Sequence, residues 1–450
     1  MCKKYLVAGA GKSGLCATAL LARNHENVIL FDENEKINKD ELLERIECED
    51  KTNVSVYIGN LTDEMLSDID AMVISPGIPT DAPFALQVKE KGIPVLSEIE
   101  LAYLYEKGTV VAITGTNGKT TTTTLVGEIM KAHNDKTFVV GNIGIPYTSL
   151  CDKTSADSVT VAEISSFQLE TIHTFKPHVS AILNITPDHL NRHYTFENYA
   201  NCKLDITKNQ EITDYAIFNY DDSDTRARAN VSNVKRIFFS RTEMLEEGVI
   251  VVDGNIVVRE AGRETVVLAV DDIKLLGVHN LENVLAAVAM TYYMGVPVET
   301  IKKVCCEFMG VEHRIEYVKT VDGVAYYNDS KGTNPDAAIK AVLAMTQKTY
   351  LIGGGYDKKS TYDEWILSFG DKVKCLVLIG ETADAISACA KSHGFTNVVR
   401  ATDLEEAVKY CHANAKEGEA VLLSPACASW DMFKSYEQRG DLFKEYVRKL

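Results

Sequence analysis

A short segment from Ala112 to Thr121 joins an apolar stretch to a turn that contains two glycines. The four apolar residues 110–113 predict a buried strand, and residues 125–130 predict part of a helix. Gly115 and Gly118 would let backbone N–H groups approach phosphate oxygens, and the N-terminus of the helix would add a favourable dipole. The segment therefore predicts a strand, a phosphate-binding turn and a helix in succession.

Lys119 and Thr120 follow the second glycine directly. A lysine there would reach the outer phosphates of a nucleotide, and a threonine hydroxyl could bind a metal ion. The full phosphate-loop pattern has an earlier glycine at the position of Ile113, so this turn is a shortened variant. The alternative is a glycine turn that caps an ordinary helix, but it does not explain Gly-Lys-Thr directly behind a strand.

Composition limits the class of protein. At 450 residues the chain is too long for one ordinary core, and we expect about two to four domains. The net charge of −17 argues against a general nucleic-acid binder, because contact with a phosphate backbone needs a basic surface. The 11 cysteines include no CxxC pair, which indicates reduced thiols. No apolar run is long enough to cross a bilayer and no signal peptide is evident, so we predict a cytoplasmic protein without membrane insertion.

The N-terminal block alternates strands and helices, which predicts a parallel, doubly wound sheet. Gly9, Gly11 and Gly14 fit the GxGxxG pattern, and Asp32 ends the next strand. This pattern alone would suggest a nicotinamide-dependent dehydrogenase, but the phosphate loop is more specific, and we interpret the turn as a nucleotide-sugar site. The expected elements are strands over 5–9, 28–31 and 71–74 and a helix that follows the turn at 11–14 and ends at about Arg23.

Two further α/β blocks follow. The second begins near Ile99, and the third begins around Gly310 with another parallel sheet. Short Val/Ile runs over 235–278 predict strands of an edge sheet, followed by a helix from Val278 to Met294. The other expected elements are strands over 158–162, 179–183, 325–328, 350–352, 376–379 and 420–423 and helices over 335–344 and 404–413.

Three residues in the second block could take part in chemistry. Glu163 ends a strand, where a carboxylate could hold the Mg²⁺ of ATP or could simply be solvated. His189 follows another strand and could bind a metal or substrate or be an ordinary hydrogen-bonded histidine, as we expect of His193. Lys203 lies on an expected helix, and from the residues alone it is a surface lysine.

Taken together, the motifs resemble the Mur ligase family over essentially the whole chain. The run at 424–431 with QRGD at 438–441 is more similar to the branch of that family that adds D-glutamate than to its sibling branches. The motifs, in order, are GTNGKTT (115–121), GNIG (141–144), AEISSFQL (162–169), NITPDHL (184–190), HNLEN (279–283), HR (313–314), NDSKGTN (328–334), SPACASWDMF (424–433) and QRGD (438–441).

The resemblance implies an α/β protein of three domains. These are a Rossmann-like N-terminal domain that binds the UDP precursor (1–98), a central P-loop ATPase-like domain with a mostly parallel sheet (99–309), and a Rossmann-like C-terminal domain that binds the amino acid (310–450). It implies an ATP-dependent ligase that joins D-glutamate to UDP-N-acetylmuramoyl-L-alanine through an acyl phosphate. We expect a monomer.

The resemblance also implies roles for individual residues. Lys119, His189 and Lys203 would be catalytic, with Lys203 carbamylated because a free ammonium would repel nearby Mg²⁺. Two Mg²⁺ sites would use Thr120, Glu163, His189 and the carbamate of Lys203. ATP would be bound by Gly115, Thr116, Asn117, Gly118, Lys119, Thr120, Thr121, Asn280, Asn283, Arg314, Asp329 and Lys331.

The substrates would be bound by two other groups of residues. The UDP precursor would be bound by Gly11, Lys12, Ser13, Asp32, Ser75, Gly77, Asn142, Gln168 and His189. D-Glutamate would be bound by Thr333, Lys358, Ser429 and Tyr436. Tyr436 stands where some relatives have Phe, and the adjacent Lys359 leaves open which lysine takes the role of Lys358. We expect Cys427 to be a small packed residue rather than a nucleophile.

Three alternatives remain at this stage. The first is a sibling ligase that adds L-alanine or diaminopimelate, or a folylpolyglutamate synthase. The second is a nicotinamide oxidoreductase built on the N-terminal block, which leaves Lys119 and Glu163 unexplained. The third is an inactive nucleotide-binding protein, although every position named above holds a chemically competent residue.

Overall fold

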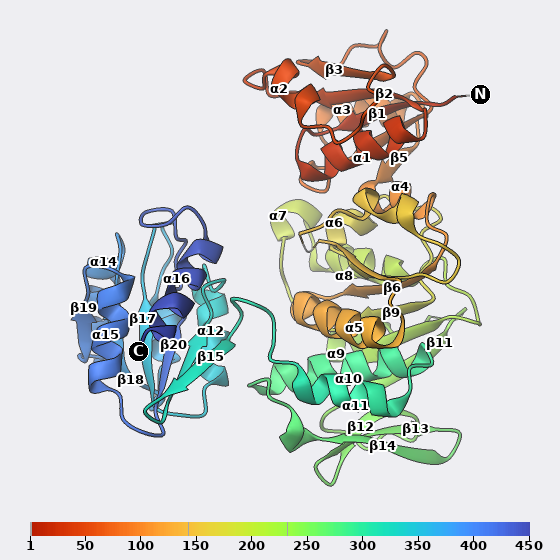
Figure 1. The fold of residues 1–450 in the computed structure, drawn as a ribbon. Coiled ribbons are helices and arrows are strands. Elements are labelled where there is room, and N and C mark those ends of the chain that lie inside the picture. The colour runs from red at the N-terminus through yellow and green to blue at the C-terminus, as the bar shows by residue number, and fades with distance from the viewer. Residues whose placement is uncertain (1, 143, 232) are drawn as a thin grey trace. The chain divides into compact units, whose positions relative to one another are not determined.

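The structure is a computed structural model that describes residues 2–142, 144–231 and 233–450. The chain divides into two compact units, one of Met1–Asp272 with Glu282–Cys306 and one of Ile273–Leu281 with Glu307–Leu450. The first unit contains two sheets and the second contains one, and each sheet is flanked by helices (Figure 1). The predicted α/β class with three mostly parallel sheets is confirmed. These units do not separate the first sheet from the second, so the expected boundaries at 98/99 and 309/310 stay predictions.

The N-terminal sheet has five parallel strands in the order β3-β2-β1-β4-β5. Its centre is built from apolar strands, and the side chains of β1 and β4 are almost entirely buried. The elements are β1 (Lys4–Ala8), α1 (Lys12–Arg23), β2 (Asn27–Asp32), α2 (Lys39–Glu44), β3 (Val54–Ile58), β4 (Ala71–Ile74), α3 (Pro83–Glu90), β5 (Val95–Ser97) and α4 (Glu98–Tyr103).

The central sheet has nine strands in the order β14-β13-β12-β11-β10-β9-β6-β8-β7. The strands from β7 to β12 pair in parallel, and β12, β13 and β14 form an antiparallel edge. The edge strands expected over 235–278 therefore extend this sheet. The strands are β6 (Thr109–Thr114), β7 (Thr137–Gly141), β8 (Val159–Glu163), β9 (Val179–Ile182), β10 (Tyr215–Asn219), β11 (Lys235–Ser240), β12 (Gly248–Val252), β13 (Asn255–Glu260) and β14 (Arg263–Ala269).

Helices between these strands complete the central part of the chain. They are α5 (Lys119–His133), α6 (Ser166–Leu169), α7 (Leu190–His193), α8 (Phe196–Leu204), α9 (Ser223–Arg228), α10 (Val278–Tyr293) and α11 (Val298–Glu307). Short 3-10 helices cover Tyr147–Ser149, Cys151–Lys153, Asp205–Thr207 and Val270–Asp272. Within the described ranges, no helix is both long enough and apolar enough to span a membrane.

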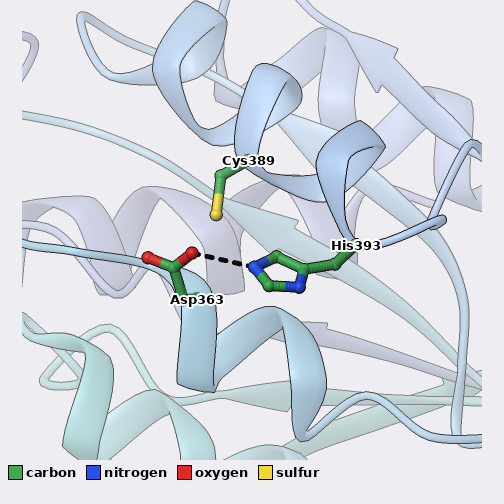
Figure 2. Close-up of side chains that lie close together, drawn as sticks. All are labelled: Asp363, Cys389 and His393. Atoms are coloured by element: carbon green, nitrogen blue, oxygen red, sulfur yellow. Dashed lines mark hydrogen bonds and ion pairs between the residues drawn. The ribbon is translucent and has the colours of Figure 1, made fainter.

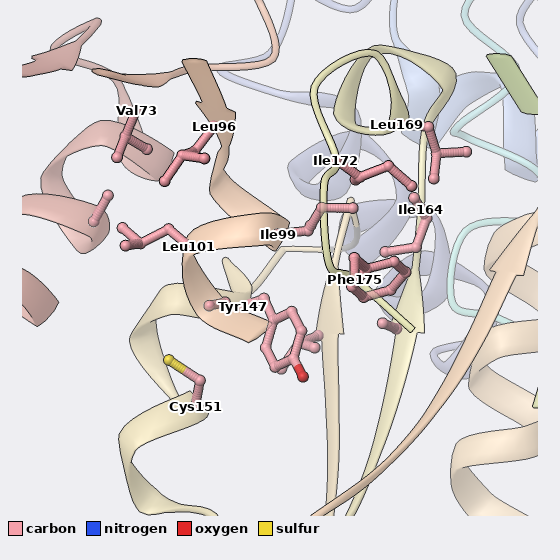
Figure 3. Close-up of a cluster of buried hydrophobic side chains, with 14 of the residues drawn as sticks. Val73, Leu96, Ile99, Leu101, Tyr147, Cys151, Ile164, Leu169, Ile172 and Phe175 are labelled. Atoms are coloured by element: carbon pink, nitrogen blue, oxygen red, sulfur yellow. The ribbon is translucent and has the colours of Figure 1, made fainter. Parts of the chain in front are cut away.

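The short helix α4 fixes the N-terminal sheet to the central sheet. Apolar residues of the two sheets and of α4 form one buried cluster, with Ile99 and Leu101 between them (Figure 3). The buried carboxylate of Glu98 accepts hydrogen bonds from the N–H and hydroxyl of Thr148, at 2.7 and 2.8 Å. Burial raises the pKa of Glu98, and these donors offset part of the cost of burying it.

The sheet of the second unit has six strands in the order β15-β16-β20-β17-β18-β19. Only β15 is antiparallel to its neighbour, so loops after the other strands gather at one edge. The elements are β15 (Glu316–Val321), β16 (Val324–Asn328), α12 (Pro335–Ala344), β17 (Thr349–Gly353), α13 (Asp363–Leu367), β18 (Val373–Leu378), α14 (Ala383–Ser392), β19 (Val398–Arg400), α15 (Leu404–Asn414), β20 (Ala420–Leu423) and α16 (Tyr436–Arg448).

Candidate active site

A cleft of about 530 Å³ lies over the carboxyl ends of β1, β2 and β4 in the N-terminal sheet. All six residues of this domain that were predicted to bind the UDP precursor line it: Gly11, Lys12, Ser13, Asp32, Ser75 and Gly77. A Cβ on Gly14 would lie 1.8 Å from the carbonyl oxygen of Gly9, so only glycine lets α1 approach the turn this closely. The cleft thus has the glycine-rich turn and helix N-terminus that suit a phosphate-bearing ligand.

Asp32 stabilises the floor of this cleft. Its carboxylate accepts hydrogen bonds from the N–H of Ala10 at 2.8 Å and from the N–H of Asn34 at 2.9 Å. The cleft is also lined by Ile78, Pro79 and Phe84, which the sequence analysis did not single out. Ile78 and Pro79 belong to the same Ser-Pro-Gly-Ile-Pro run as Ser75 and Gly77, so they could have been predicted to line the cleft together with those two residues.

The phosphate loop joins β6 to α5, as predicted. Gly118 caps α5 in a left-handed conformation with φ of 84°, and a Cβ there would lie 2.2 Å from Oδ1 of Asn283. The left-handed backbone therefore favours glycine at this position, and any larger residue would also displace the side chain of Asn283. Thr120 and Thr121 lie in the first turn of α5, where the backbone N–H groups of a helix have no intrahelical acceptor.

Two side chains brace the loop. The ammonium of Lys119 donates to the carbonyl oxygens of Gly115 and Thr116, at 2.7 and 2.9 Å. Asn184, two residues after the end of β9, accepts from the N–H of Asn117 at 2.8 Å and donates to its carbonyl oxygen at 3.1 Å. Asn184 was missed as a functional residue, and its place at the end of a strand beside β6 was the signal available in the sequence.

Glu163 is buried at the end of β8, opposite Ile113 of β6, and is not the solvated acid of the alternative interpretation. Its Oε1 accepts from the side-chain amide of Asn142 at 2.9 Å, whereas its Oε2 has no hydrogen-bond partner among the residues that the structure describes. A buried carboxylate oxygen without a donor is costly unless a cation binds it. The residues here therefore fit a hard divalent cation. Ile143, in the same GNIG motif as Asn142, lies outside the described residues.

Lys203 is buried on α8, which corrects the expectation of a surface lysine from the residues alone. Its ammonium donates to the carbonyl oxygen of Gly115 at 2.9 Å and lies 4.5 Å from the ring centre of Tyr199. Burial, with a smaller effect from the charge of Lys119, lowers the pKa of Lys203 to about 7. The residues alone did not predict that Lys203 is buried, because its burial depends on the packing of one face of α8 against the phosphate loop.

His189 lies before α7 in a left-handed conformation with φ of 51°, and about half of its side chain is exposed. Its ring centre is 4.9 Å from that of Phe167, which also stacks on His193. His193 is buried and hydrogen-bonded to the hydroxyl of Ser166 at 3.0 Å, the ordinary kind of histidine that we expected. Gln168 is buried too, and its amide oxygen accepts from the N–H and hydroxyl of Ser165 in the capping box of α6.

The second unit holds further predicted residues, and of these Lys331 lies beside Tyr436. The carboxylate of Asp329 is buried, accepts from the hydroxyl of Ser424 at 2.7 Å and receives the N–H of Ile315, next to Arg314, at 3.3 Å. Burial raises its pKa to about 7. The ammonium of Lys331 lies 5.5 Å from the ring centre of Tyr436. Asn280, in the same unit, donates to the carbonyl oxygen of Leu276 at 2.7 Å.

Arg439, which the motif QRGD contains but to which no role was assigned, connects these loops. Its guanidinium is fully buried and donates to Oγ and O of Ser330, at 3.0 and 2.8 Å, and to the carbonyl oxygens of Cys427 and Ala428, at 3.2 and 3.3 Å. These contacts hold the loop before Thr333 beside the loop before Ser429. Cys427 is buried and hydrogen-bonded to Tyr362, in line with the packed residue that we expected.

The two adjacent lysines, Lys358 and Lys359, differ in their surroundings. The ammonium of Lys358 lies 5.0 Å from the ring centre of Trp430, directly after Ser429, whereas Lys359 has a left-handed backbone with φ of 59°. Trp430 is 63% exposed and packs against Tyr356, so these two aromatic rings form a surface beside Lys358. Sequence reasoning missed this surface, although the exposed tryptophan lies within a recognised motif.

A lysine-bearing phosphate loop on a parallel sheet, a glycine-rich cleft on a second sheet and a third sheet with clustered charged loops define a multidomain nucleotide-binding enzyme. Family models named Mur ligase MurD-like, N-terminal domain, Mur ligase middle domain, and Mur ligase, glutamate ligase domain match residues 3–97, 113–291 and 313–427. The chain belongs to the Mur ligase family, and the resemblance carried by its motifs is confirmed.

Relatives match over the full length. The chain is 53% identical over 448 residues to the UDP-N-acetylmuramoylalanine–D-glutamate ligase of Lachnoclostridium phytofermentans, covering 100% of this chain and 98% of that protein. It is 44% identical to the ligase of the same name from Clostridioides difficile, covering 100% and 99%. Among solved structures, UDP-N-acetylmuramate-alanine ligase MurC from Thermotoga maritima matches with a TM-score of 0.59 and 18% identity over 100% of both chains. MurF from Acinetobacter baumannii matches with a TM-score of 0.61 and 17% identity over 98% of this chain and 93% of that one, and these two likenesses concern the fold alone.

Proposed function

We propose that this chain joins D-glutamate to UDP-N-acetylmuramoyl-L-alanine with the conversion of ATP to ADP and phosphate, as UDP-N-acetylmuramoylalanine–D-glutamate ligase does in peptidoglycan synthesis. The observation that carries the proposal is the identity of 53% over the full length to a relative of that name. The enzyme acts in the cytoplasm as a monomer. Residues 1–98 bind the precursor, residues 99–309 bind ATP and residues 310–450 bind D-glutamate.

The UDP part of the precursor binds in the N-terminal cleft. Lys12 and the backbone N–H groups of the turn offset the negative charge of the diphosphate, and Asp32 keeps the turn in shape. Asn142, Gln168 and His189 lie along the path to the muramoyl-alanine end. Support comes from the cleft itself, because its lining includes every predicted residue of the N-terminal domain.

ATP binds over the phosphate loop. The loop and Lys119 hold the phosphates, and Asn283 lies beside Gly118. The remaining ATP contacts are Asn280, Arg314, Asp329 and Lys331.

Thr120, Glu163, His189 and the carbamate of Lys203 would hold Mg²⁺ at two sites. Bound there, Mg²⁺ would supply positive charge to offset that of the transferring phosphoryl group. The unpaired oxygen of Glu163 supports such a site. The burial of Lys203 supports the carbamate, because the amine must be neutral to attack CO₂, and burial favours the neutral form.

D-Glutamate binds in the second unit between Thr333, Lys358, Ser429 and Tyr436. Its two carboxylates need cationic or hydrogen-bonding partners, which Lys358 and the hydroxyls supply.

The reaction takes place in two steps. Lys119 stabilises the γ-phosphoryl group while the alanine carboxylate takes it up, and the resulting acyl phosphate is then attacked by the amine of D-glutamate with loss of phosphate.

The proposal is tested by phosphate release from ATP and Mg²⁺ with UDP-N-acetylmuramoyl-L-alanine and one amino acid at a time. We expect release with D-glutamate but not with L-glutamate, L-alanine or diaminopimelate. Release with another amino acid would move the protein to a sibling branch of the family. Release that persists in Lys119→Ala would come from a contaminant, so this variant is the control.

A further inference from the structure

Three side chains with no part in the proposed reaction meet where α13 begins and α14 ends. Asp363 is the first residue of α13, Cys389 lies on α14, and His393 directly follows the last residue of α14. One ligand atom of each lies within 4.8 Å of the other two. His393 Nε2 is 2.8 Å from Oδ1 of Asp363, and the sulfur of Cys389 points into the same space (Figure 2).

The donor set selects one class of ion. Thiolate, imidazole and carboxylate together suit a borderline-soft cation such as Zn²⁺, whereas Mg²⁺ prefers oxygen ligands only. Cys389 and His393 are one helical turn apart, so they present their ligand atoms on one side of α14. Asp363 is 58% exposed and His393 is 26% exposed, which leaves room for water as a further ligand.

The two helices that carry the ligands are packed through aromatic rings. The ring centre of Phe369 is 5.3 Å from that of Trp365 on α13 and 5.2 Å from that of Phe395, just beyond His393. Trp365 and Phe369 are fully buried. The ligands therefore project from a rigid base, which lowers the entropy lost when an ion binds.

A second cluster of possible metal ligands in the same unit differs from the first, because a lysine already pairs with its carboxylates. Glu312, His313 and Asp441 also lie close together, but the ammonium of Lys444 pairs with Glu312 and lies 3.2 Å from Asp441. A cation of the protein itself already satisfies these carboxylates. At Asp363, the described contacts are those with His393 and Cys389 and include no lysine or arginine.

We propose that Asp363, Cys389 and His393 form a binding site for a zinc-class divalent cation, distinct from the Mg²⁺ sites of the ligase reaction. Binding replaces the hydrogen bond between His393 and Asp363 with two metal bonds, leaves the proton of the neutral His393 ring on Nδ1 instead of Nε2, and releases the thiol proton of Cys389. An ion bound here connects the start of α13 to the end of α14.

Co²⁺ is the probe, because a thiolate bound to Co²⁺ gives a charge-transfer absorption band. We expect the full chain to bind one Co²⁺ with this band, and Zn²⁺ to displace it while excess Mg²⁺ does not. Cys389→Ser should abolish the band, and His393→Ala should weaken binding at least about ten-fold. Cys48→Ser, which removes another partly exposed thiol, is the matched control and should keep the band.

The absence of a band in the unaltered chain, or a band that persists in Cys389→Ser, would overturn the proposal. Displacement of Co²⁺ by Mg²⁺ would also overturn it, because the site would then be an oxygen site. Phosphate release should be equal in Cys389→Ser and the unaltered chain. The binding readout does not depend on the ligase assignment, so failure of one leaves the other testable.

Discussion

The substitution Arg439→Met tests whether the buried guanidinium holds the loop before Thr333 beside the loop before Ser429. Arg439→Met keeps the length of the side chain but removes every donor. Ser330 Oγ still bonds to the carbonyl oxygen of Tyr436, and the carbonyl oxygen of Ala428 still accepts from Tyr356. The loss therefore falls on the carbonyl oxygens of Ser330 and Cys427.

An unsatisfied buried acceptor costs about 1–3 kcal/mol, so these two carbonyls cost about 2–6 kcal/mol. With a urea slope of about 2 kcal/mol/M, the unfolding midpoint of the second unit should fall by about 1–3 M. Tryptophan fluorescence measures this directly, because both tryptophans of the chain, Trp365 and Trp430, belong to that unit. The KM for D-glutamate should rise, while binding of the UDP precursor in the N-terminal cleft stays unchanged.

The matched control is Arg448→Met, which removes an exposed arginine from the same helix, α16. A surface change of this kind should alter the free energy of unfolding by no more than about 0.5 kcal/mol. Equal urea midpoints for the two variants, with an unchanged KM for D-glutamate in Arg439→Met, would refute the reasoning.

Three further predictions concern single carboxylates and the buried lysine. Burial raises the pKa of Asp329 to about 7, so the folded state binds this proton more tightly than the unfolded chain, and the contribution of Asp329 to stability falls as pH rises towards 7. The free energy of unfolding of Asp329→Asn, measured in urea, should therefore rise by about 2 kcal/mol relative to that of the unaltered chain as the pH increases from about 5 to about 7. A difference between the two free energies that does not change with pH would contradict this. With ¹³C-labelled bicarbonate at neutral pH, a carbamate signal should appear in the unaltered chain and vanish in Lys203→Arg, because about half of the amine is neutral when the pKa is about 7. Asp32→Ala should weaken binding of the UDP precursor about ten-fold or more in calorimetry, whereas Asp40→Ala, on exposed α2, should not, and equal affinities would argue against the role of Asp32.

Much of the fold could be predicted from local patterns. Apolar runs bounded by glycine turns located the central strands of all three sheets, and β4, β20 and α12 have the predicted bounds. Strands such as β15 and β19 were missed, because they lie at sheet edges, where one face is half exposed and the apolar signal is weak.

The site was predictable only in part, for a physical reason. Residues in glycine turns and at strand ends stand out, because the chemistry requires those types at those positions. Lys203 and Arg439 do not, because whether a long cationic side chain points to solvent or into the loops depends on tertiary packing. Motif recognition selected Lys203, while only the structure shows how Arg439 connects the loops around Ser330 and Cys427.

The central claim is that the chain activates the alanine carboxylate of the precursor and couples it to D-glutamate. It is tested most directly with precursor labelled with ¹⁸O in that carboxylate, followed by mass spectrometry of the product and of the released phosphate. The account predicts a product extended by D-glutamate, with one ¹⁸O atom carried into each phosphate. Phosphate free of ¹⁸O would contradict activation as an acyl phosphate, and an absence of product with D-glutamate would contradict the assignment itself.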